Sequence, residues 1–289
     1  MSTVSVDAAT RASTLIEALP YMRAYRGKTA VVKIGGAALD DEVRSQSVAH
    51  DLALMALVGM RLVIVHGGGP QVSAAMIDAG IEPSFVDGLR VTEPATMEIV
   101  RRVLIGTINT DLVARLSGAG LQPVGLSGFD GTQIRADRAT GTGGSSLGRV
   151  GHVREVSPAL ITSLLDDGYT PVIASVAPDD DGSALNVNAD DVAGAVAGAL
   201  GAAKLIYLTN VDGLYKDLGD EGSLISEIKL DELEALAPRL STGMRPKVDS
   251  AIAALHAGVE KAHILDGRVE HALLLEIFTD GGAGTLVLA

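Results

Sequence analysis

Apolar residues in this chain follow two patterns that alternate along the sequence. Short, largely apolar runs, such as those at 29–34 and 61–65, predict buried strands. Between them lie stretches in which apolar positions recur every three or four residues, the period of an amphipathic helix. Strands separated by helices imply a mostly parallel sheet with helices on both faces. We therefore expect an α/β fold, a three-layer αβα sandwich around a mainly parallel central sheet.

The same patterns place the remaining elements. Further strands are expected at 123–126, 170–174, 184–187, 204–208, 261–265 and 285–288. Helices are expected at 40–58, 71–79, 94–118, 158–167, 189–200, 230–238, 244–257 and 268–275. Residues 130–155 are predicted to form a β-hairpin around a glycine-rich turn at 141–144.

An amphipathic helix at 7–26 precedes the first strand, so it need not belong to the core. Pro20 falls inside it and is expected to kink or break it. Its apolar stripe must be buried somewhere, most simply against the same helix of another subunit. We therefore separate residues 1–27, as an oligomerisation or regulatory helix, from the rest. A boundary near residue 200 divides that rest into 28–200 and 201–289, although no linker marks it.

Composition narrows the classes of partner. The 289 residues are 47% hydrophobic, enough for a substantial core. The net charge of −13 argues against nucleic acid, because phosphate contacts need clustered Lys and Arg. The lack of cysteine excludes disulfides and fits a cytoplasmic protein. The uncharged stretch 192–203 is too short to span a membrane, and residues 1–25 lack a secretory pattern. The six histidines lack metal-site spacing.

Two glycine loops carry the first chemical signal. Residues 33–36 (Lys-Ile-Gly-Gly) and 66–70 (His-Gly-Gly-Gly-Pro) each follow an apolar strand and precede a helix. Successive glycines let backbone N–H groups turn toward an anion, and the helix start adds a positive dipole end. Tight turns alone would also explain such loops, but two of them favour phosphate binding. Walker A and G-x-G-x-x-G are absent, yet the shared geometry leaves a nicotinamide oxidoreductase as an alternative.

Three charged residues complete a candidate phosphoryl-transfer site. Lys33 ends a strand beside glycines, and Lys247 opens a helix after a glycine-containing loop. Lysines at such places suit phosphoryl transfer, because charge builds on the transferred group. Asp190, in Asn-Val-Asn-Ala-Asp at 186–190, either holds the two lysines in place or simply caps the following helix. The residues alone leave both roles open.

Two further segments suggest binding of a carboxylate and a nucleotide. Arg90 follows a turn, and its guanidinium fork fits a carboxylate, although a rim arginine is the alternative. The segment 208–215 ends a buried strand with an Asp-Gly turn. The carboxyl end of a central strand is where a nucleotide is expected to lie.

In order and spacing, these motifs resemble the amino acid kinase family from about Leu19 to the C-terminus. Within it the resemblance is to members that phosphorylate N-acetyl-L-glutamate. The motifs are K-x-G-G at 33–36, H-G-G-G-P at 66–70, F-V-D-G-L-R-V-T at 85–92, N-V-N-A-D at 186–190, L-T-N-V-D-G-L-Y at 208–215, G-M-x-P-K at 243–247 and H-A-L-L-L-E-I-F-T-D-G-G-A-G-T at 271–285.

The resemblance implies ATP-dependent phosphorylation of the γ-carboxylate of N-acetyl-L-glutamate, the second step of arginine biosynthesis. Residues 28–200 would bind the acylated amino acid and 201–289 the nucleotide, with Mg²⁺ held mainly by the phosphates of ATP. It makes Lys33 and Lys247 the residues that stabilise the transferring phosphoryl group, and Asp190 the residue that positions them. The implied substrate-binding residues are Gly68, Gly69, Arg90 and Asn186. The implied phosphoryl- or ATP-binding residues are Gly35, Gly36, Thr209, Asp212, Gly213, Leu214 and Met244.

Regulation is also implied by the resemblance. Arginine-inhibited members have an N-terminal helix interlaced between dimers, giving a hexamer built as a trimer of dimers. The residues implied to lie near L-arginine are Tyr21, Lys204, His263, Glu276 and Gly284. The alternative for Glu276 is a solvent-facing helix end. Besides the nicotinamide oxidoreductase, two alternative functions remain: a kinase for an N-blocked aminoadipate in lysine biosynthesis, and an inactive arginine-sensing subunit.

Overall fold

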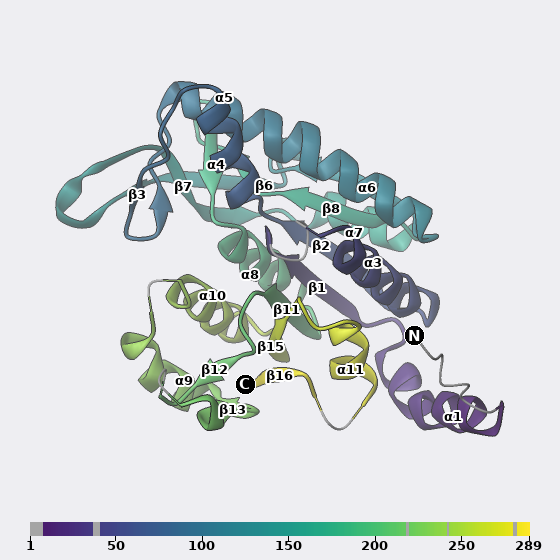
Figure 1. The fold of residues 1–289 in the computed structure, drawn as a ribbon. Coiled ribbons are helices and arrows are strands. Elements are labelled where there is room, and N and C mark those ends of the chain that lie inside the picture. Colours follow the sequence, from purple (N-terminus) through teal and green to yellow (C-terminus); the bar gives the residue numbers. More distant parts are fainter. Residues whose placement is uncertain (1–7, 37–40, 218–219, 242, 280–281) are drawn as a thin grey trace.

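The computed structural model describes residues 8–36, 41–217, 220–241, 243–279 and 282–289. At its centre lies an eight-stranded sheet (Figure 1). All neighbouring strands in it are parallel except the pair β15–β16. The spatial order is β14 (Glu227–Lys229), β16 (Gly284–Leu288), β15 (Lys261–Asp266), β11 (Lys204–Thr209), β1 (Thr29–Ile34), β2 (Arg61–His66), β8 (Thr170–Ala174) and β5 (Pro123–Ser127).

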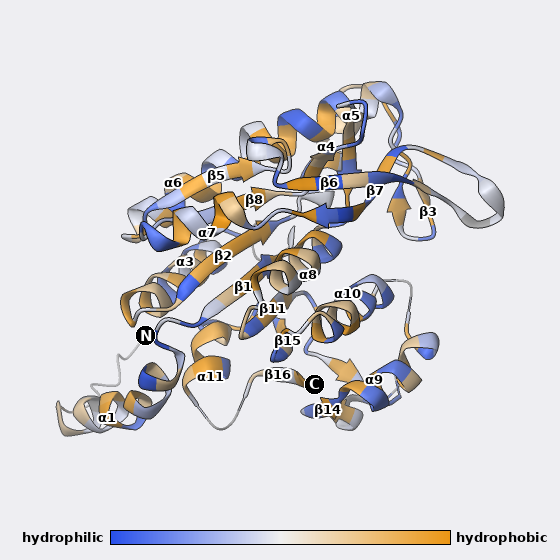
Figure 2. Ribbon diagram, turned by 180° about the vertical axis from the view of Figure 1, so that it is seen from behind, coloured by the Kyte–Doolittle hydropathy of each residue, from blue (hydrophilic) through white to orange (hydrophobic). Residues whose placement is uncertain are grey.

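Helices cover both faces of this sheet, and each face has its own apolar core. Alternate side chains of a strand point to opposite faces, so Val31 and Val32 belong to different cores. Figure 2 shows that β1 and β2 are hydrophobic along most of their length. The helices packed on the Val32 face are α3 (Glu42–Leu57), α6 (Asn109–Gly118) and α11 (Ala272–Phe278). Those on the Val31 face are α7 (Ala159–Asp166), α8 (Ala189–Leu200), α9 (Leu230–Leu236) and α10 (Arg245–His256). The three-layer αβα prediction is confirmed.

A smaller sheet and two short hairpins project from this body. The predicted excursion at 130–155 is confirmed as an antiparallel hairpin of β6 (Ile134–Thr140) and β7 (Ser146–Val156). It extends into a four-stranded sheet through β10 (Ala184–Val187) and β9 (Val176–Pro178). The short hairpins are β3 (Phe85–Val86) with β4 (Leu89–Arg90), and β12 (Leu214–Tyr215) with β13 (Leu224–Ile225). Helices α4 (Gly69–Asp78) and α5 (Pro94–Arg101) lie at the same end of the molecule (Figure 1).

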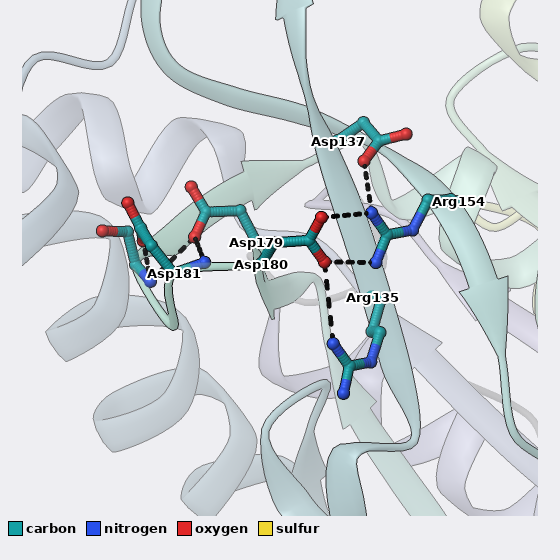
Figure 3. Close-up of polar contacts among 7 residues, drawn as sticks. Arg135, Asp137, Arg154, Asp179, Asp180 and Asp181 are labelled. Atoms are coloured by element: carbon teal, nitrogen blue, oxygen red, sulfur yellow. Dashed lines mark hydrogen bonds and ion pairs between the residues drawn. The ribbon is translucent and has the colours of Figure 1, made fainter.

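A charge cluster ties the turn between β9 and β10 to the β6–β7 hairpin (Figure 3). Arg154 donates to both carboxylate oxygens of Asp180, at 2.6 and 2.9 Å, and to Asp137 at 3.0 Å. Arg135 lies 3.7 Å from the same Asp180 carboxylate. These ion pairs are exposed to solvent and add little to stability, but they link the turn to the hairpin.

Helix α1 (Ala8–Tyr25) lies outside the layers and packs beside α11 (Figure 1). The expectation that Pro20 breaks this helix is wrong, because α1 runs through it without interruption. Proline costs the hydrogen bond to the carbonyl four residues earlier. Here that carbonyl belongs to Ile16, an exposed residue, so water can satisfy it. The side chains of Leu15 and Ile16 are 65% and 68% exposed.

Two other predicted helices differ from the structure. The stretch 94–118 is helical throughout, but α5 and α6 are joined by a π-helix at Arg102–Ile108 (the π segment). The helix predicted at 268–275 instead spans Ala272–Phe278. His271 takes a left-handed conformation with φ 59°, which is incompatible with a helix interior. No described helix is long and apolar enough to cross a membrane.

Candidate active site

The two glycine loops lie side by side because β1 and β2 are parallel neighbours that end together. Ile34 pairs with His66, so Gly35 and the glycines that follow His66 start from the same edge of the sheet. Between the loops lies a cavity of about 240 Å³. Its lining includes Lys33, Gly35, Gly36, Gly67, Gly68, Gly69, Arg90 and Asn186. The structure thus brings the candidate phosphate loops and the candidate substrate residues to one cavity.

Close backbone approach explains two of these glycines. A β-carbon at Gly68 would collide with the side chains of Ile108 and Leu104. At Gly35 a β-carbon would lie 3.0 Å from the carbonyl oxygen of Leu208. Only glycine lets each loop pack at this distance, which leaves the backbone free to line the cavity.

Lys33, Asp190 and Lys247 (the charged trio) meet beside this cavity. Lys33 Nζ lies 2.9 Å from Asp190 Oδ1, and Lys247 Nζ lies 2.9 Å from Asp190 Oδ2. Asp190 stands in the first turn of α8 and Lys247 in the first turn of α10. The cap of α8 is Asn188, whose side chain accepts from the Asp190 N–H at 2.9 Å. The capping alternative for the Asp190 carboxylate is therefore wrong.

The charges of the trio perturb one another strongly. Burial alone would raise the pKa of Asp190, but the two ammonium groups lower it to about 2. Burial lowers the pKa of Lys247, with repulsion from Lys33 acting in the same direction and the Asp190 carboxylate opposing it. With one carboxylate between two lysines, the trio carries a net positive charge when all three groups are ionised. An anion is the natural ligand of such a group.

A chain of two buried hydrogen bonds ends at the backbone of Asp190. The Tyr207 hydroxyl donates to Ser250 Oγ at 2.8 Å, and Ser250 in turn donates to the Asp190 carbonyl. A β-carbon at Gly194 would collide with Ser250, so small residues let α8 and α10 approach closely. Sequence reasoning did not select Tyr207 or Ser250. The signal for Tyr207 is its place in a buried strand, where its hydroxyl needs a partner.

Arg90 is buried, so the rim-arginine alternative is wrong. Its Nη2 donates to the Gly69 carbonyl at 2.8 Å and to Ser73 Oγ at 2.7 Å, while the guanidinium stacks on Phe85 at 4.7 Å. One edge of the Arg90 guanidinium is therefore hydrogen-bonded to the second glycine loop. Asn186 donates to Thr92 Oγ1 at 3.2 Å.

The residues predicted for the nucleotide divide into two sets. Gly213, Leu214 and Met244 line a second cavity of about 280 Å³, together with Val211, Tyr215, Leu240 and Ser241. Thr209 and Asp212 are not among its lining residues. The Asp212 carboxylate instead accepts from the Tyr215 hydroxyl at 2.7 Å and from Arg268 at 3.2 Å.

A second buried charged cluster lies where α1 meets the sheet. Lys204 Nζ lies 2.9 Å from His263 Nε2, and His263 Nδ1 lies 2.6 Å from Glu276 Oε1. Glu276 Oε2 accepts from the Ala283 N–H at 2.7 Å, so Glu276 does not face solvent. The Lys204 ammonium lies 4.7 Å from the centre of the Tyr25 ring. Tyr21 packs against the neighbouring apolar core, and Gly284 opens β16.

Burial sets the charge states in this second cluster. Burial lowers the pKa of Lys204 to about 8 and also lowers the pKa of His263. Burial would raise the pKa of Glu276, but the bond from His263 and the nearby positive charges lower it. A carboxylate held this way is ready to accept from a cationic ligand.

The match to a family model decides the relationship. The model of the amino acid kinase family matches residues 28–266. The chain belongs to the amino acid kinase family. A curated member, the acetylglutamate kinase of Thermosynechococcus vestitus, is 49% identical over 280 residues, which cover 96% of this chain and 94% of that protein.

Solved structures place the fold in the same group. The N-acetylglutamate synthase of Neisseria gonorrhoeae, complexed with coenzyme A and N-acetyl-glutamate, superposes with a TM-score of 0.86 at 29% identity. The match covers 96% of this chain and 63% of the synthase, so this chain spans less than two thirds of that protein. The same synthase complexed with coenzyme A and L-arginine gives a TM-score of 0.82 at 27% identity, covering 96% of this chain and 65% of the synthase.

Proposed function

We propose that this protein is an acetylglutamate kinase, which transfers the γ-phosphoryl group of ATP to the γ-carboxylate of N-acetyl-L-glutamate. The product is an acyl phosphate, and the reaction is the second step of arginine biosynthesis. The observation that carries the proposal is the charged trio beside the two glycine loops. The relative from Thermosynechococcus vestitus supports the choice of acceptor. We also propose a cytoplasmic location, on the ground that the reaction consumes ATP.

The proposed reaction needs no general acid–base catalyst. A carboxylate acceptor is already ionised near neutral pH and serves as its own nucleophile, so no general base is required. Asp190, with a pKa of about 2 and both oxygens paired to lysines, is too weak a base for that role. Catalysis is then positioning plus neutralisation of charge, which lysines and backbone N–H groups supply.

Each residue set has a proposed task. Lys33 and Lys247 stabilise the transferring phosphoryl group, and Asp190 holds the two ammonium groups in place. Arg90 and Asn186 bind the acceptor with Gly68 and Gly69, since all four line one cavity. Gly35 and Gly36 hold phosphoryl groups, while Gly213, Leu214 and Met244 bind the nucleoside. Residues 28–200 thus form the acceptor lobe, and 201–289 the nucleotide lobe.

Magnesium fits this site as a companion of ATP. Among the described residues, no three His, Cys, Asp or Glu side chains form a metal-binding group. The cavity between the glycine loops is lined by two cations, Lys33 and Arg90, and Lys247 joins Lys33 at the Asp190 carboxylate. These groups repel a free cation and attract phosphate. Mg²⁺ bound through the phosphates of ATP supplies further neutralisation of the developing charge.

We propose further that L-arginine inhibits the enzyme at the Lys204–His263–Glu276 cluster. Glu276, which His263 already contacts, is the proposed partner of the guanidinium, and Tyr21 and Gly284 are proposed as further contacts of the ligand. The arginine complex of the similar synthase supports this ligand. The exposed Leu15 and Ile16 of α1 support assembly through this helix, as a hexamer built from three dimers.

ATP turnover measured side by side with N-acetylglutamate, glutamate and N-acetyl-aminoadipate tests the proposal. We expect turnover with N-acetylglutamate and trapping of its product by hydroxylamine, which reacts with acyl phosphates. Preferred use of the aminoadipate would favour the lysine-biosynthesis alternative. Turnover with none of the three would favour an inactive sensing subunit. A change at the nicotinamide absorbance band would point to an oxidoreductase.

A further inference from the structure

The π segment between α5 and α6 packs directly on the second glycine loop. Its defining bond runs from the Asn109 N–H to the Leu104 carbonyl, five residues back. Turns of this kind are rare in proteins, and those that do occur often lie at functional sites. Leu104 and Asn109, the two residues joined by this bond, are both buried. Leu104 and Ile108 meet Gly68, where a β-carbon would collide with both side chains.

The Asn109 side chain has one possible orientation. It is buried, and its Nδ2 lies 2.9 Å from the Val172 carbonyl and 3.0 Å from His66 Nε2. A carbonyl can only accept, so the amide nitrogen must face this way. Both amide hydrogens are then donated, one to Val172 and one to His66. His66 Nε2 is therefore the acceptor, and the ring proton sits on Nδ1.

The fixed tautomer of His66 in turn fixes the orientation of a peptide unit in the second glycine loop. The Nδ1 proton is donated to the Gly67 carbonyl, which lies 3.0 Å away. The ring is fully buried, and burial lowers the pKa of His66 to about 4, so the ring is neutral at pH 7. In a trans peptide unit the carbonyl and the following N–H point in opposite directions. Fixing the Gly67 carbonyl toward the ring therefore fixes the Gly68 N–H away from it.

A glycine on the edge strand of the sheet makes room for this arrangement. A β-carbon at Gly125 of β5 would collide with Asn109 Oδ1. Gly125 has an extended backbone there, so its conformation does not require glycine. The space it leaves is filled by the Asn109 carboxamide.

We propose that His66 and Asn109 are positioning residues, which fix the Gly68 N–H so that it points at the phosphoryl group as this group reaches the acceptor held by the same loop. The inference rests on the proposed function and adds to it the device that holds the loop. A preorganised N–H stabilises developing charge only when its direction is fixed beforehand. Losing that direction therefore lowers kcat more than it weakens binding of the nucleoside.

Asn109→Ala tests the first link, with Thr107→Ala, an exposed side chain of the π segment, as the matched control. We expect kcat to fall by about 10- to 100-fold in Asn109→Ala while KM for ATP changes by less than about twofold. Thr107→Ala should behave as the wild type. An unchanged kcat in a folded Asn109→Ala protein would overturn the proposal.

Two substitutions of His66 test the second link and do not depend on Asn109→Ala folding. Asn at this position keeps an N–H close to the place of Nδ1, whereas Leu keeps bulk without a donor. We expect His66→Asn to retain at least about tenfold more of the wild-type kcat than His66→Leu. Equal kcat values in the two variants would contradict the positioning role, whatever their thermal stability.

A double-mutant cycle tests whether Gly125 acts on kcat through the Asn109 side chain. Gly125→Ala alone should lower kcat, because its methyl group displaces the Asn109 carboxamide. In the Asn109→Ala background it should add little, since the atom that it would strike is gone. Full additivity of the two effects would count against the coupling.

A readout independent of turnover separates this inference from the proposed function. In ¹⁵N-histidine spectra, the resonance lost in His66→Asn should show a proton on Nδ1 and none on Nε2 from pH 8 to pH 5. If the wild type shows this tautomer but does not phosphorylate N-acetylglutamate, the proposed function fails and the hydrogen-bond device stands. If the tautomer is reversed while turnover is normal, the positioning proposal fails alone.

Discussion

Lys247 Nζ lies 2.9 Å from Asp190 Oδ2, although the two residues are 57 positions apart and both side chains are buried. The contact exists because α8 and α10 start at the same end of the sheet and pack closely. Burying ions costs several kcal/mol each, so such a pair is weak evidence for stability. Its position beside the glycine loops points instead to the reaction.

Replacing Lys247 by Ala should lower kcat far more than it raises KM for ATP. Removing one donor aimed at the developing charge costs about 10²–10³ in kcat. Steady-state kinetics with ATP and N-acetylglutamate give both constants. Lys229→Ala, which removes an exposed lysine, should match the wild type and serves as the control. A normal kcat in Lys247→Ala would remove this lysine from the proposed mechanism.

Acidification should lower the free energy of unfolding through Asp190. The pKa of Asp190 is lowered from 3.8 to about 2 on folding. Its ionised carboxylate therefore stabilises the folded state above pH 4, and this stabilisation is lost as pH falls through 2. The full contribution is about 2 kcal/mol, and about 1 kcal/mol of it is lost between pH 6 and pH 3.

Denaturant unfolding of the wild type and Asp190→Asn at these two pH values checks this expectation. The wild type should lose about 1 kcal/mol more than the variant between pH 6 and pH 3. Exposed Asp78→Asn should follow the wild type. The same pH dependence in Asp190→Asn would show that this carboxylate is not the group responsible.

Arg90→Lys should raise KM for N-acetylglutamate more than about tenfold and leave KM for ATP nearly unchanged. A lysine has no fork and cannot hold the Gly69 carbonyl while also binding a carboxylate. Arg101→Lys, at an exposed position, is the control. Equal effects on the two KM values would contradict a role in acceptor binding.

Removing residues 1–26 should convert a hexamer into dimers, as seen by light scattering, and weaken inhibition by arginine while basal activity survives. The double substitution Leu15→Asp and Ile16→Asp keeps the helix but charges its exposed apolar surface, so it should also dissociate the hexamer. A truncated protein that is still hexameric and fully arginine-sensitive would refute both the assembly and the regulatory proposal.

The hydrophobic pattern is sufficient to predict most of the fold, because short apolar runs such as 29–34 alternate with longer stretches that have the period of a helix. It does not predict the π segment, since residues 94–118 keep the same spacing of apolar positions through α5 and α6. It also places the last helix too early. His271 is left-handed, and its side chain lies 2.6 Å from Asp51, 220 positions away, a tertiary contact that local spacing does not reveal.

Some features of the site could be predicted from the residues alone, and others could not. The adjacent glycine loops follow from parallel strands alone, whereas the assignment of Asp190 to both lysines came from the resemblance. Helix capping by Asp190 was an equally good reading of the sequence, and only the Asn188 side chain decides between them. Asn109 gives no signal in the sequence, because its importance depends on a turn that local spacing does not reveal.

The position of β16 in the central sheet constrains how the molecule can be synthesised. This strand lies between β14 and β15, which both precede it in the chain. Until residues 284–288 leave the ribosome, β14 has no partner in the sheet, and one edge of β15 stays open. Open strand edges invite pairing with other chains. Folding of the proposed nucleotide lobe therefore cannot be completed before residues 284–288 have emerged, while the strands β1, β2, β5 and β8 can pair with one another earlier.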